Sequence, residues 1–190
     1  MTLRVGILGG TFDPVHNAHL AIARAALAQA GVAKILWIPT GAPGYREPPV
    51  APARERVAML KLALTGESRY AIDERELRPG ASGFTFDSIS SLKNENPGSR
   101  FLLRFLLIMG ADQYEKRTSW HRWAEIEQLC DIAVCARPGI QLDGKAKAIP
   151  MTLMDISASD IRTRVARGED ISAMVPLPVA AHIRAQGLYR

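Results

Sequence analysis

One stretch near the amino terminus decides how the rest of the chain is interpreted: Gly9-Gly10-Thr11-Phe12-Asp13-Pro14-Val15-His16-Asn17-Ala18-His19-Leu20. It follows an apolar run of strand length, Leu3–Leu8. Beyond it, apolar residues recur at helical spacing over Ala18–Ala30. The stretch is therefore expected to form a tight glycine turn between a strand and a helix.

The residue types in this turn indicate a phosphate site. Gly9 and Gly10 let the backbone approach a ligand closely, and His16 and His19 lie where the helix begins. A helix N-terminus carries unpaired N–H groups and a partial positive charge, which suit phosphate. A Gly-Gly turn or a His-x-x-His pair alone is common in unrelated proteins. Their combination at one turn favours a functional site.

The turn resembles the signature of the nucleotidyltransferases, in which Gly-x-Phe-Asp-Pro is followed by His-x-Gly-His or Thr-x-Gly-His. Here the second part is His16-Asn17-Ala18-His19, so Ala18 replaces the usual glycine. Alanine is a better helix former than glycine, and its methyl group is small. The substitution is expected to leave the function in place.

The composition is that of an ordinary globular protein. Of 190 residues, 47% are hydrophobic and 23% charged, so one domain over residues 1–190 is expected, with 156–190 as a helical C-terminal subregion. No apolar run approaches the roughly 20 residues of a membrane helix, and no signal peptide is recognisable. Cys130 and Cys135 are expected to be buried thiols in a reducing compartment, which favours a cytoplasmic protein.

The net charge of +5 does not by itself indicate nucleic-acid binding. Lysines and arginines are scattered, aromatic residues make up 6% of the chain, and no basic stripe is interleaved with aromatic side chains. Small polyanionic ligands account for the surplus as well as RNA does. Neither a nucleic acid nor a membrane is therefore expected as a partner, and a homo-oligomer is left open.

Strand and helix signals alternate along the chain, which predicts an α/β fold: a Rossmann-like, doubly wound parallel sheet with helices on both faces and a small C-terminal helical part. Strands are expected at Leu3–Leu8, Lys34–Ile38, Arg69–Asp73, Leu103–Met109, Asp131–Ala136 and Thr152–Asp155. Helices are expected at Ala18–Ala30, Ala53–Thr65, Phe86–Lys93, Trp120–Leu129 and Pro178–Gln186, and a further one within Ile156–Arg162 with Ser157 or Ser159 as its cap. Thr85 is expected to cap the third helix, and Gln141–Ala148 to form a polar surface loop.

Two further turns carry residues suited to ligand binding. The strand at Leu103–Met109 ends in Gly110-Ala111-Asp112-Gln113, a second glycine turn followed by an acid. Ser157-Ala158-Ser159-Asp160-Ile161-Arg162 combines two hydroxyls, a helix start and a guanidinium that suits phosphate. Alone, the latter would be interpreted as a capping motif with an exposed arginine. Because ligands of parallel sheets bind at the carboxyl ends of strands, the turns at Gly9-Gly10 and at Gly110 are expected to face one crevice.

Several separated stretches together resemble bacterial nicotinate-nucleotide adenylyltransferases, in the family's order and over nearly the whole chain. They are Gly9–Leu20, Pro39–Arg46, Asp73–Leu77, Phe84-Thr85, Gly110–Asp112, Trp120, Cys135–Gly139, Ile156–Arg162 and Gln186–Arg190. The resemblance implies transfer of the adenylyl group of ATP to nicotinate mononucleotide, giving nicotinate adenine dinucleotide and pyrophosphate. ATP and the mononucleotide are then the small-molecule partners, and Mg²⁺ would arrive bound to ATP.

The resemblance also implies a role for individual residues. His16 and His19 would be catalytic, with His19 stabilising the transition state. The ATP site would comprise Gly9, Gly10, Thr11, Phe12, His16, His19, Arg137, Ser157, Ser159 and Arg162. The mononucleotide site would comprise Arg46, Phe84, Thr85, Gly110, Asp112 and Trp120, the last by stacking on the pyridine ring. No side chain of the protein is expected to bind a metal ion.

Two departures from the family pattern concern the acceptor. Tyr45 stands where the family's proline loop usually has histidine, and Gly83 replaces the serine of Ser-Tyr-Thr, whose tyrosine is Phe84 here. A close alternative is therefore an adenylyltransferase for another phosphorylated acceptor, such as nicotinamide mononucleotide or phosphopantetheine. A second alternative is a nucleotide- or RNA-binding module without catalysis.

Overall fold

The structure, a computed structural model, describes residues 3–41, 47–95, 103–139, 141–142, 144, 146–152 and 154–190. Within these residues a six-stranded sheet has the order β3-β2-β1-β4-β5-β6, and each strand runs parallel to its neighbours. The strands are β1 (Leu3–Gly10), β2 (Lys34–Pro39), β3 (Tyr70–Ile72), β4 (Leu103–Gly110), β5 (Asp131–Ala136) and β6 (Lys147–Pro150). The expected Rossmann-like, doubly wound sheet is confirmed, and its strand order reverses between β1 and β4.

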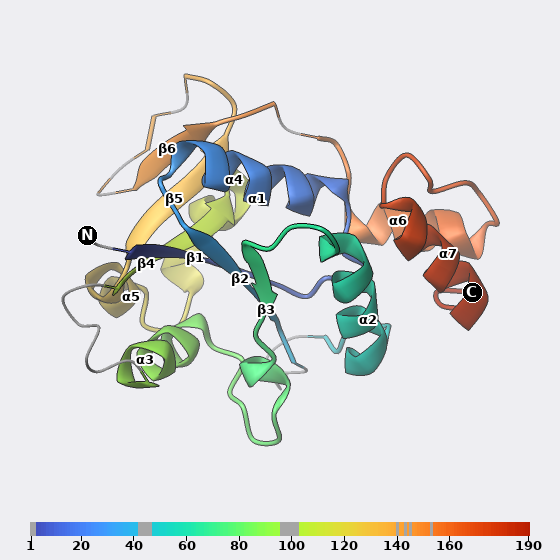
Figure 1. Cartoon of the computed structure of the whole chain (residues 1–190), viewed down its shortest axis with the longest axis horizontal. Coiled ribbons are helices and arrows are strands. Elements are labelled where there is room, and N and C mark those ends of the chain that lie inside the picture. Colours follow the sequence, from blue (N-terminus) through green and yellow to red (C-terminus); the bar gives the residue numbers. More distant parts are fainter. Residues whose placement is uncertain are drawn as a thin grey trace.

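Helices cover both faces of the sheet. They are α1 (Asn17–Gln29), α2 (Ala53–Leu64), α3 (Thr85–Glu95), α4 (Ala111–Glu115), α5 (Trp123–Leu129), α6 (Ala158–Ala166) and α7 (Leu177–Gln186). Leu8 and Ile108 pack in one apolar cluster with α1 and α2, whereas Ile7 and Leu107 pack in a second with α3 and α5. Burial on both faces explains why β1 and β4 are nearly continuous apolar runs. Figure 1 shows the two layers on either side of the central strands.

The C-terminal helices lie beside α2 at one end of the molecule (Figure 1). Val179 and Ile183 of α7 are buried in the cluster that also contains α1 and α2. His182 Nε2 lies 2.9 Å from Glu55 Oε2 of α2, which adds a polar contact across the same interface. Gly187, with φ of 62°, ends α7 as expected from the sequence, because glycine adopts this left-handed conformation without steric cost.

The last strand is not where the sequence indicated. Thr152–Asp155 contains no strand among its described residues, and β6 lies at Lys147–Pro150, partly inside the segment predicted as a polar loop. β6 is an edge strand that pairs only with β5, and only its Ile149 is buried. An edge strand with one buried residue carries little periodicity, which explains the error.

Two helix beginnings also differ from the prediction. Thr85 is the first residue of α3 rather than its cap, so Phe84 takes the preceding position. α5 begins at Trp123 rather than Trp120, because Arg122 has a left-handed backbone with φ of 57°. A short 3-10 helix, Arg117–Ser119, precedes it. Trp120 therefore lies in the loop between this 3-10 helix and α5.

Candidate active site

A cavity of about 1210 Å³ opens where the carboxyl ends of β1 and β4 meet. Parallel sheets bind ligands at the carboxyl ends of their strands, at the place where the strand order reverses. The volume exceeds that of typical single-ligand pockets, so it has room for two small molecules. The expected site residues that line it are Gly9, Gly10, Thr11, Phe12, His16, His19, Phe84, Thr85, Gly110, Asp112, Trp120, Ser157, Ser159 and Arg162.

The turn after β1 is organised around the side chain of Phe12, which is 1% exposed and has φ of 50°. Its ring meets the ring of His19 edge-on, with centroids 5.0 Å apart, and tilts against Trp37 at 5.5 Å. A Cβ at Gly10 would lie 3.0 Å from two carbons of the Phe12 ring, whereas a Cβ at Gly9 would meet only the Ile38 carbonyl oxygen at 4.0 Å. A side chain at Gly10 would therefore force the Phe12 ring to shift by a few tenths of an ångström, while Gly9 leaves free space in the cavity.

The two imidazoles at the start of α1 form a stacked pair. The rings of His16 and His19 have centroids 3.7 Å apart and an interplanar angle of 27°. The backbone N–H of His16 donates to Nδ1 of His19 at 3.2 Å. Neutral His19 must therefore carry its proton on Nε2, and this N–H is the donor it can offer to a ligand.

Both histidines are neutral at pH 7. Burial lowers the pKa of His16 to about 4, and Nδ1 of this side chain has no hydrogen-bond partner among the described residues. Burial, and then the neighbouring His16, lower the pKa of His19 well below its usual value. The pair thus offers N–H donors to phosphate oxygens rather than net positive charge.

Asp13 joins this turn to a distant segment. Its side chain is 3% exposed, and its carboxylate accepts the backbone N–H groups of Val50 at 2.7 Å and Ala51 at 3.1 Å. These bonds fix the residues that lead into α2 against the turn between β1 and α1. Apart from the place of Asp13 in the motif, no sequence pattern predicts this role.

Arg56 also links the turn after β1 to the segment before α2, through hydrogen bonds to backbone carbonyl oxygens. It is 2% exposed, and its Nη1 donates to the carbonyl oxygens of Thr11 at 2.7 Å and Thr40 at 2.8 Å. Its Nε donates to the carbonyl oxygen of Ala51 at 3.3 Å. The sequence placed Arg56 near the start of a helix and assigned it no role. A buried arginine of this kind cannot be distinguished by pattern from an exposed helix-surface arginine.

The second phosphate-like turn lies on the same cavity. Ser157 caps α6 by accepting the backbone N–H of Asp160 at 3.1 Å, and its Oγ lies 3.1 Å from that of Ser159. Arg162 Nη1 donates to the backbone carbonyl oxygen of Asp13 at 2.8 Å. The guanidinium is thereby fixed beside the turn after β1, and residues of both turns line the same cavity.

The opposite wall of the cavity is aromatic. The ring of Phe84 stacks on the imidazole of His121, with centroids 4.3 Å apart, and Trp120 meets Trp123 edge-on at 5.9 Å. The backbone N–H of Phe84, expected to face a ligand carboxylate, donates to Oγ of Ser82 at 3.2 Å. His121 also lines the cavity. No sequence pattern predicts a role for His121, since a lone exposed histidine belongs to no motif.

Two of the expected residues are not brought to the cavity by the described part of the structure. Arg46, together with the departure at Tyr45, lies outside the described residues. Arg137 directly follows β5, is exposed, and is absent from the cavity lining. Gly110 and Asp112 do line it, and a Cβ at Gly110 would lie 2.8 Å from Oδ1 of Asp112. The carboxylate of Asp112 therefore lies close over the end of β4.

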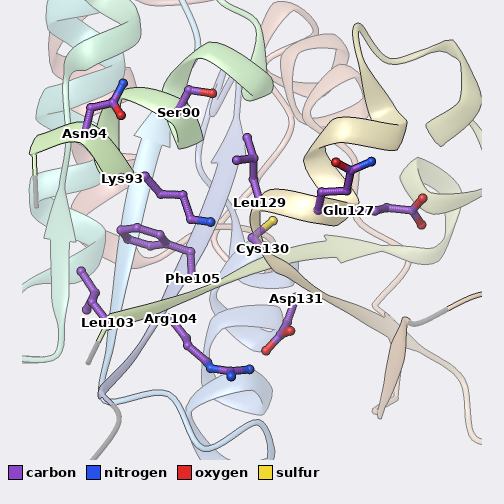
Figure 2. Close-up of a pocket in the computed structure, with 11 residues that line it drawn as sticks. Ser90, Lys93, Asn94, Leu103, Arg104, Phe105, Glu127, Leu129, Cys130 and Asp131 are labelled. Atoms are coloured by element: carbon purple, nitrogen blue, oxygen red, sulfur yellow. The ribbon is translucent and has the colours of Figure 1, made fainter. Parts of the chain in front are cut away.

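A second cavity, of about 590 Å³, lies at the opposite end of the strands. Figure 2 shows Lys93 of α3 and Phe105 of β4 on one side of it, and Leu129 and Cys130 on the other. It is formed at the amino ends of β4 and β5, where parallel sheets do not place their ligand sites. Burial raises the pKa of Cys130 to about 12, which keeps this thiol protonated and unreactive.

The described residues, 3–190 with the gaps given above, hold neither a grouped set of metal-binding side chains nor a membrane-spanning helix. Within those ranges, no three or more His, Cys, Asp or Glu side chains are grouped so that they could hold a metal ion. No helix in the same ranges is both long enough and apolar enough to cross a membrane.

Known proteins are similar to this chain over its whole length. A family model for cytidylyltransferase-like proteins matches residues 7–164. A probable nicotinate-nucleotide adenylyltransferase of Bordetella petrii is 38% identical over 200 residues, covering 98% of this chain and 99% of that protein. A protein of the same name from Chromobacterium violaceum is 34% identical over 215 residues, covering 100% of both chains.

Solved structures agree in fold. The Plasmodium falciparum nicotinic acid mononucleotide adenylyltransferase complexed with NaAD has a TM-score of 0.80 to this chain at 17% identity, covering 98% of this chain and 97% of that one. The same protein complexed with APC gives a TM-score of 0.79 at 18% identity, with the same coverage. At such low identity these neighbours support the fold alone.

Proposed function

Because the chain belongs to the cytidylyltransferase-like family, and within it to the nicotinate-nucleotide adenylyltransferases, we propose that its cavity binds ATP and nicotinate mononucleotide side by side. The enzyme transfers the adenylyl group of ATP to the mononucleotide. An oxygen of the mononucleotide 5′-phosphate attacks the α-phosphorus of ATP, and the bond from that phosphorus to the bridging oxygen of the β-phosphate breaks. Nicotinate adenine dinucleotide and pyrophosphate are the products.

The substrate supplies the nucleophile in this reaction, so the task of the protein is positioning and charge stabilisation. His19 is proposed to donate its Nε2–H to a phosphate oxygen as charge develops at the α-phosphorus. This role is supported by the bond that fixes its proton on Nε2 and by the lowered pKa that keeps the ring neutral. His16 is proposed to assist, since its buried Nδ1 lacks a partner among the described residues.

The remaining ATP contacts are proposed to come from both turns. Backbone groups of Gly9, Gly10, Thr11 and Phe12 would lie against the phosphates. The outgoing β- and γ-phosphates would be held by the hydroxyls of Ser157 and Ser159 and by the guanidinium of Arg162. A guanidinium group and a helix N-terminus both bind phosphate oxygens favourably. Arg137 is proposed to lie near the adenine on the strength of the family resemblance, although it does not line the cavity in this structure.

The aromatic wall is proposed to hold the mononucleotide. Trp120 would stack on the pyridine ring, and the start of α3 at Thr85, together with Phe84, would face its carboxylate. Gly110 and Asp112 would border the ribose. Arg46 is proposed to pair with the mononucleotide phosphate on the strength of the family resemblance, since it lies outside the described residues.

The divalent cation is proposed to be Mg²⁺ that arrives with ATP. The described residues lack a cluster of three metal-binding side chains, so phosphate oxygens and water would supply most of its ligands. The ion would offset the charge of the triphosphate. We also propose that residues 1–190 act as one nucleotidyltransferase domain, with 156–190 as a helical subregion that completes the ATP site.

The observation that carries the proposal is a stacked histidine pair and a fixed arginine on one cavity with room for two small molecules. It is tested by measuring pyrophosphate release from ATP with nicotinate mononucleotide, nicotinamide mononucleotide or phosphopantetheine as the acceptor. The first should be turned over with the highest kcat/KM. Turnover of another acceptor but not of the first would refute the proposed acceptor, and no turnover of any would favour a binding module. Tight, sequence-specific RNA affinity would contradict the proposal as well.

A further inference from the structure

Tyr189 reaches the active-site turn from the far end of the sequence. Its hydroxyl donates to Oδ1 of Asp13 at 2.7 Å, across 176 positions of the chain. The residue follows α7 and has φ of 65°, in the left-handed region that residues other than glycine rarely adopt. A conformation of this kind persists only where surrounding contacts hold it.

Asp13 is the point at which four segments of the chain meet. Its carboxylate accepts the N–H groups of Val50 and Ala51 in addition to the Tyr189 hydroxyl, and its backbone carbonyl accepts Nη1 of Arg162. Oδ1 serves two of these donors, Ala51 and Tyr189. A rotation of the carboxylate would therefore disturb the segment before α2, and a shift of the backbone would move Arg162.

The hydroxyl of Tyr189 can act only as a donor to this carboxylate. Burial and then the bond to Asp13 raise the pKa of Tyr189, so the phenol stays protonated. Loss of that donor leaves Oδ1 with one bond instead of two, in a site where Asp13 is 3% exposed. Hydrogen bonds to charged groups contribute more than neutral ones, and a carboxylate that lacks one reorients to find another.

We propose that Tyr189 is a positioning residue for adenylyl transfer, which acts through Asp13 to hold Arg162 and the Val50-Ala51 segment in their places on the cavity. This inference rests on the proposed function. The hydroxyl is not needed to attach the C-terminal helices, because Val179 and Ile183 of α7 are buried in the apolar core and His182 contacts Glu55. Removal of one oxygen atom should therefore affect the site more than the fold.

Tyr189→Phe tests the proposal, because it removes only the hydroxyl. Tyr70→Phe is the matched control, since the buried hydroxyl of Tyr70 on β3 has no hydrogen-bond partner among the described residues. Both variants are compared with the wild type well below their melting temperatures. We expect Tyr189→Phe to lower kcat/KM about tenfold and to raise the Kd for Mg-ATP, measured by calorimetry, several-fold. The control should change neither quantity.

Amide hydrogen exchange at Val50 and Ala51 shows whether the effect is transmitted through Asp13, because both N–H groups donate to its carboxylate. Exchange at these two amides should quicken in Tyr189→Phe and stay unchanged in Tyr70→Phe. Wild-type kinetics with a lower melting temperature would overturn the proposal, and so would unchanged exchange. If the wild type turned over none of the acceptors, the proposed function would fail, while Mg-ATP affinity and exchange would still decide the role of Tyr189.

Discussion

The two glycines that end β1 should respond differently to the same substitution. Gly10→Ala places a methyl group 3.0 Å from two ring carbons of Phe12, and Gly9→Ala places one 4.0 Å from its nearest neighbour. Neither glycine has a positive φ, so alanine fits both backbones. The expected contrast is loss of stability at Gly10, and loss of activity with stability retained at Gly9.

The size of the effect at Gly10 follows from how Phe12 is held. Its ring is 1% exposed and lies between His19 and Trp37, so it cannot move away without displacing one of them. Overpacking of this kind costs about 1–3 kcal/mol. For a domain of this length, that lowers the melting temperature by roughly 2–12 °C. Displacement of His19 should also lower kcat.

At Gly9 the added methyl group enters the cavity instead. Alternation along β1 directs it to the face of Ile7, which packs with α3 and α5 on the side of the aromatic wall. Gly9→Ala should keep wild-type stability or gain up to about 1 kcal/mol, through a less flexible unfolded chain. Crowding a fitted site by one carbon should lower kcat/KM on the order of tenfold.

Urea unfolding and steady-state kinetics on both variants measure the contrast. The variants match each other in chemistry and differ only in which face of β1 receives the methyl group. A Gly10→Ala protein as stable as the wild type would refute the packing argument for Phe12. A Gly9→Ala protein with wild-type kinetics would show that ligands do not approach this part of the backbone.

Three further outcomes are expected. His19→Ala should lower kcat by about 10²–10³, the effect of losing one preorganised donor, and near-normal turnover would show that the chemistry lies elsewhere. The pKa of His16 is about 4 in the folded protein and near 6.5 in an unfolded chain. Between these two pH values the unfolded state binds more protons than the folded state. The free energy of unfolding should therefore fall as the pH drops from about 6.5 to 4, by up to about 3 kcal/mol. His16→Asn should make urea midpoints less dependent on pH over that range, and an unchanged slope would contradict the assignment. Arg56→Met should cost several kcal/mol, at about 1–3 kcal/mol for each buried carbonyl oxygen left without its donor. Arg54→Met, whose side chain is 84% exposed, should stay within about 0.5 kcal/mol, and equal effects of the two substitutions would refute the difference.

Much of the fold is predictable because its central strands are buried on both faces. β1 and β4 are apolar runs bounded by glycine turns, and helical spacing marks α1 and α2. β6 is missed because burial leaves only Ile149 as a signal, on an edge with a single neighbouring strand. The start of α5 is displaced because a left-handed Arg122 is set by tertiary packing and not by local preference.

The candidate site is predictable where its residues are local to one turn. His16 and His19, or Ser157 and Arg162, stand within a few positions of each other. The side chains that hold these turns together are not predictable, because their bonds join distant segments. Arg56 reaches the carbonyl oxygen of Thr11 across 45 positions, and no periodicity records such a contact.

The separation between Asp13 and Arg162 has a consequence for biosynthesis. β1 leaves the ribosome before the other strands and helices described above, yet it lies at the centre of the sheet and gains its second neighbour only with β4. The bond to Arg162 spans 149 positions. A nascent chain that has only β1 and its turn therefore holds a phosphate-binding motif that cannot yet form its bond to Arg162. Domains fold as units during synthesis, so catalytic competence arrives late and in one step, when α6 docks.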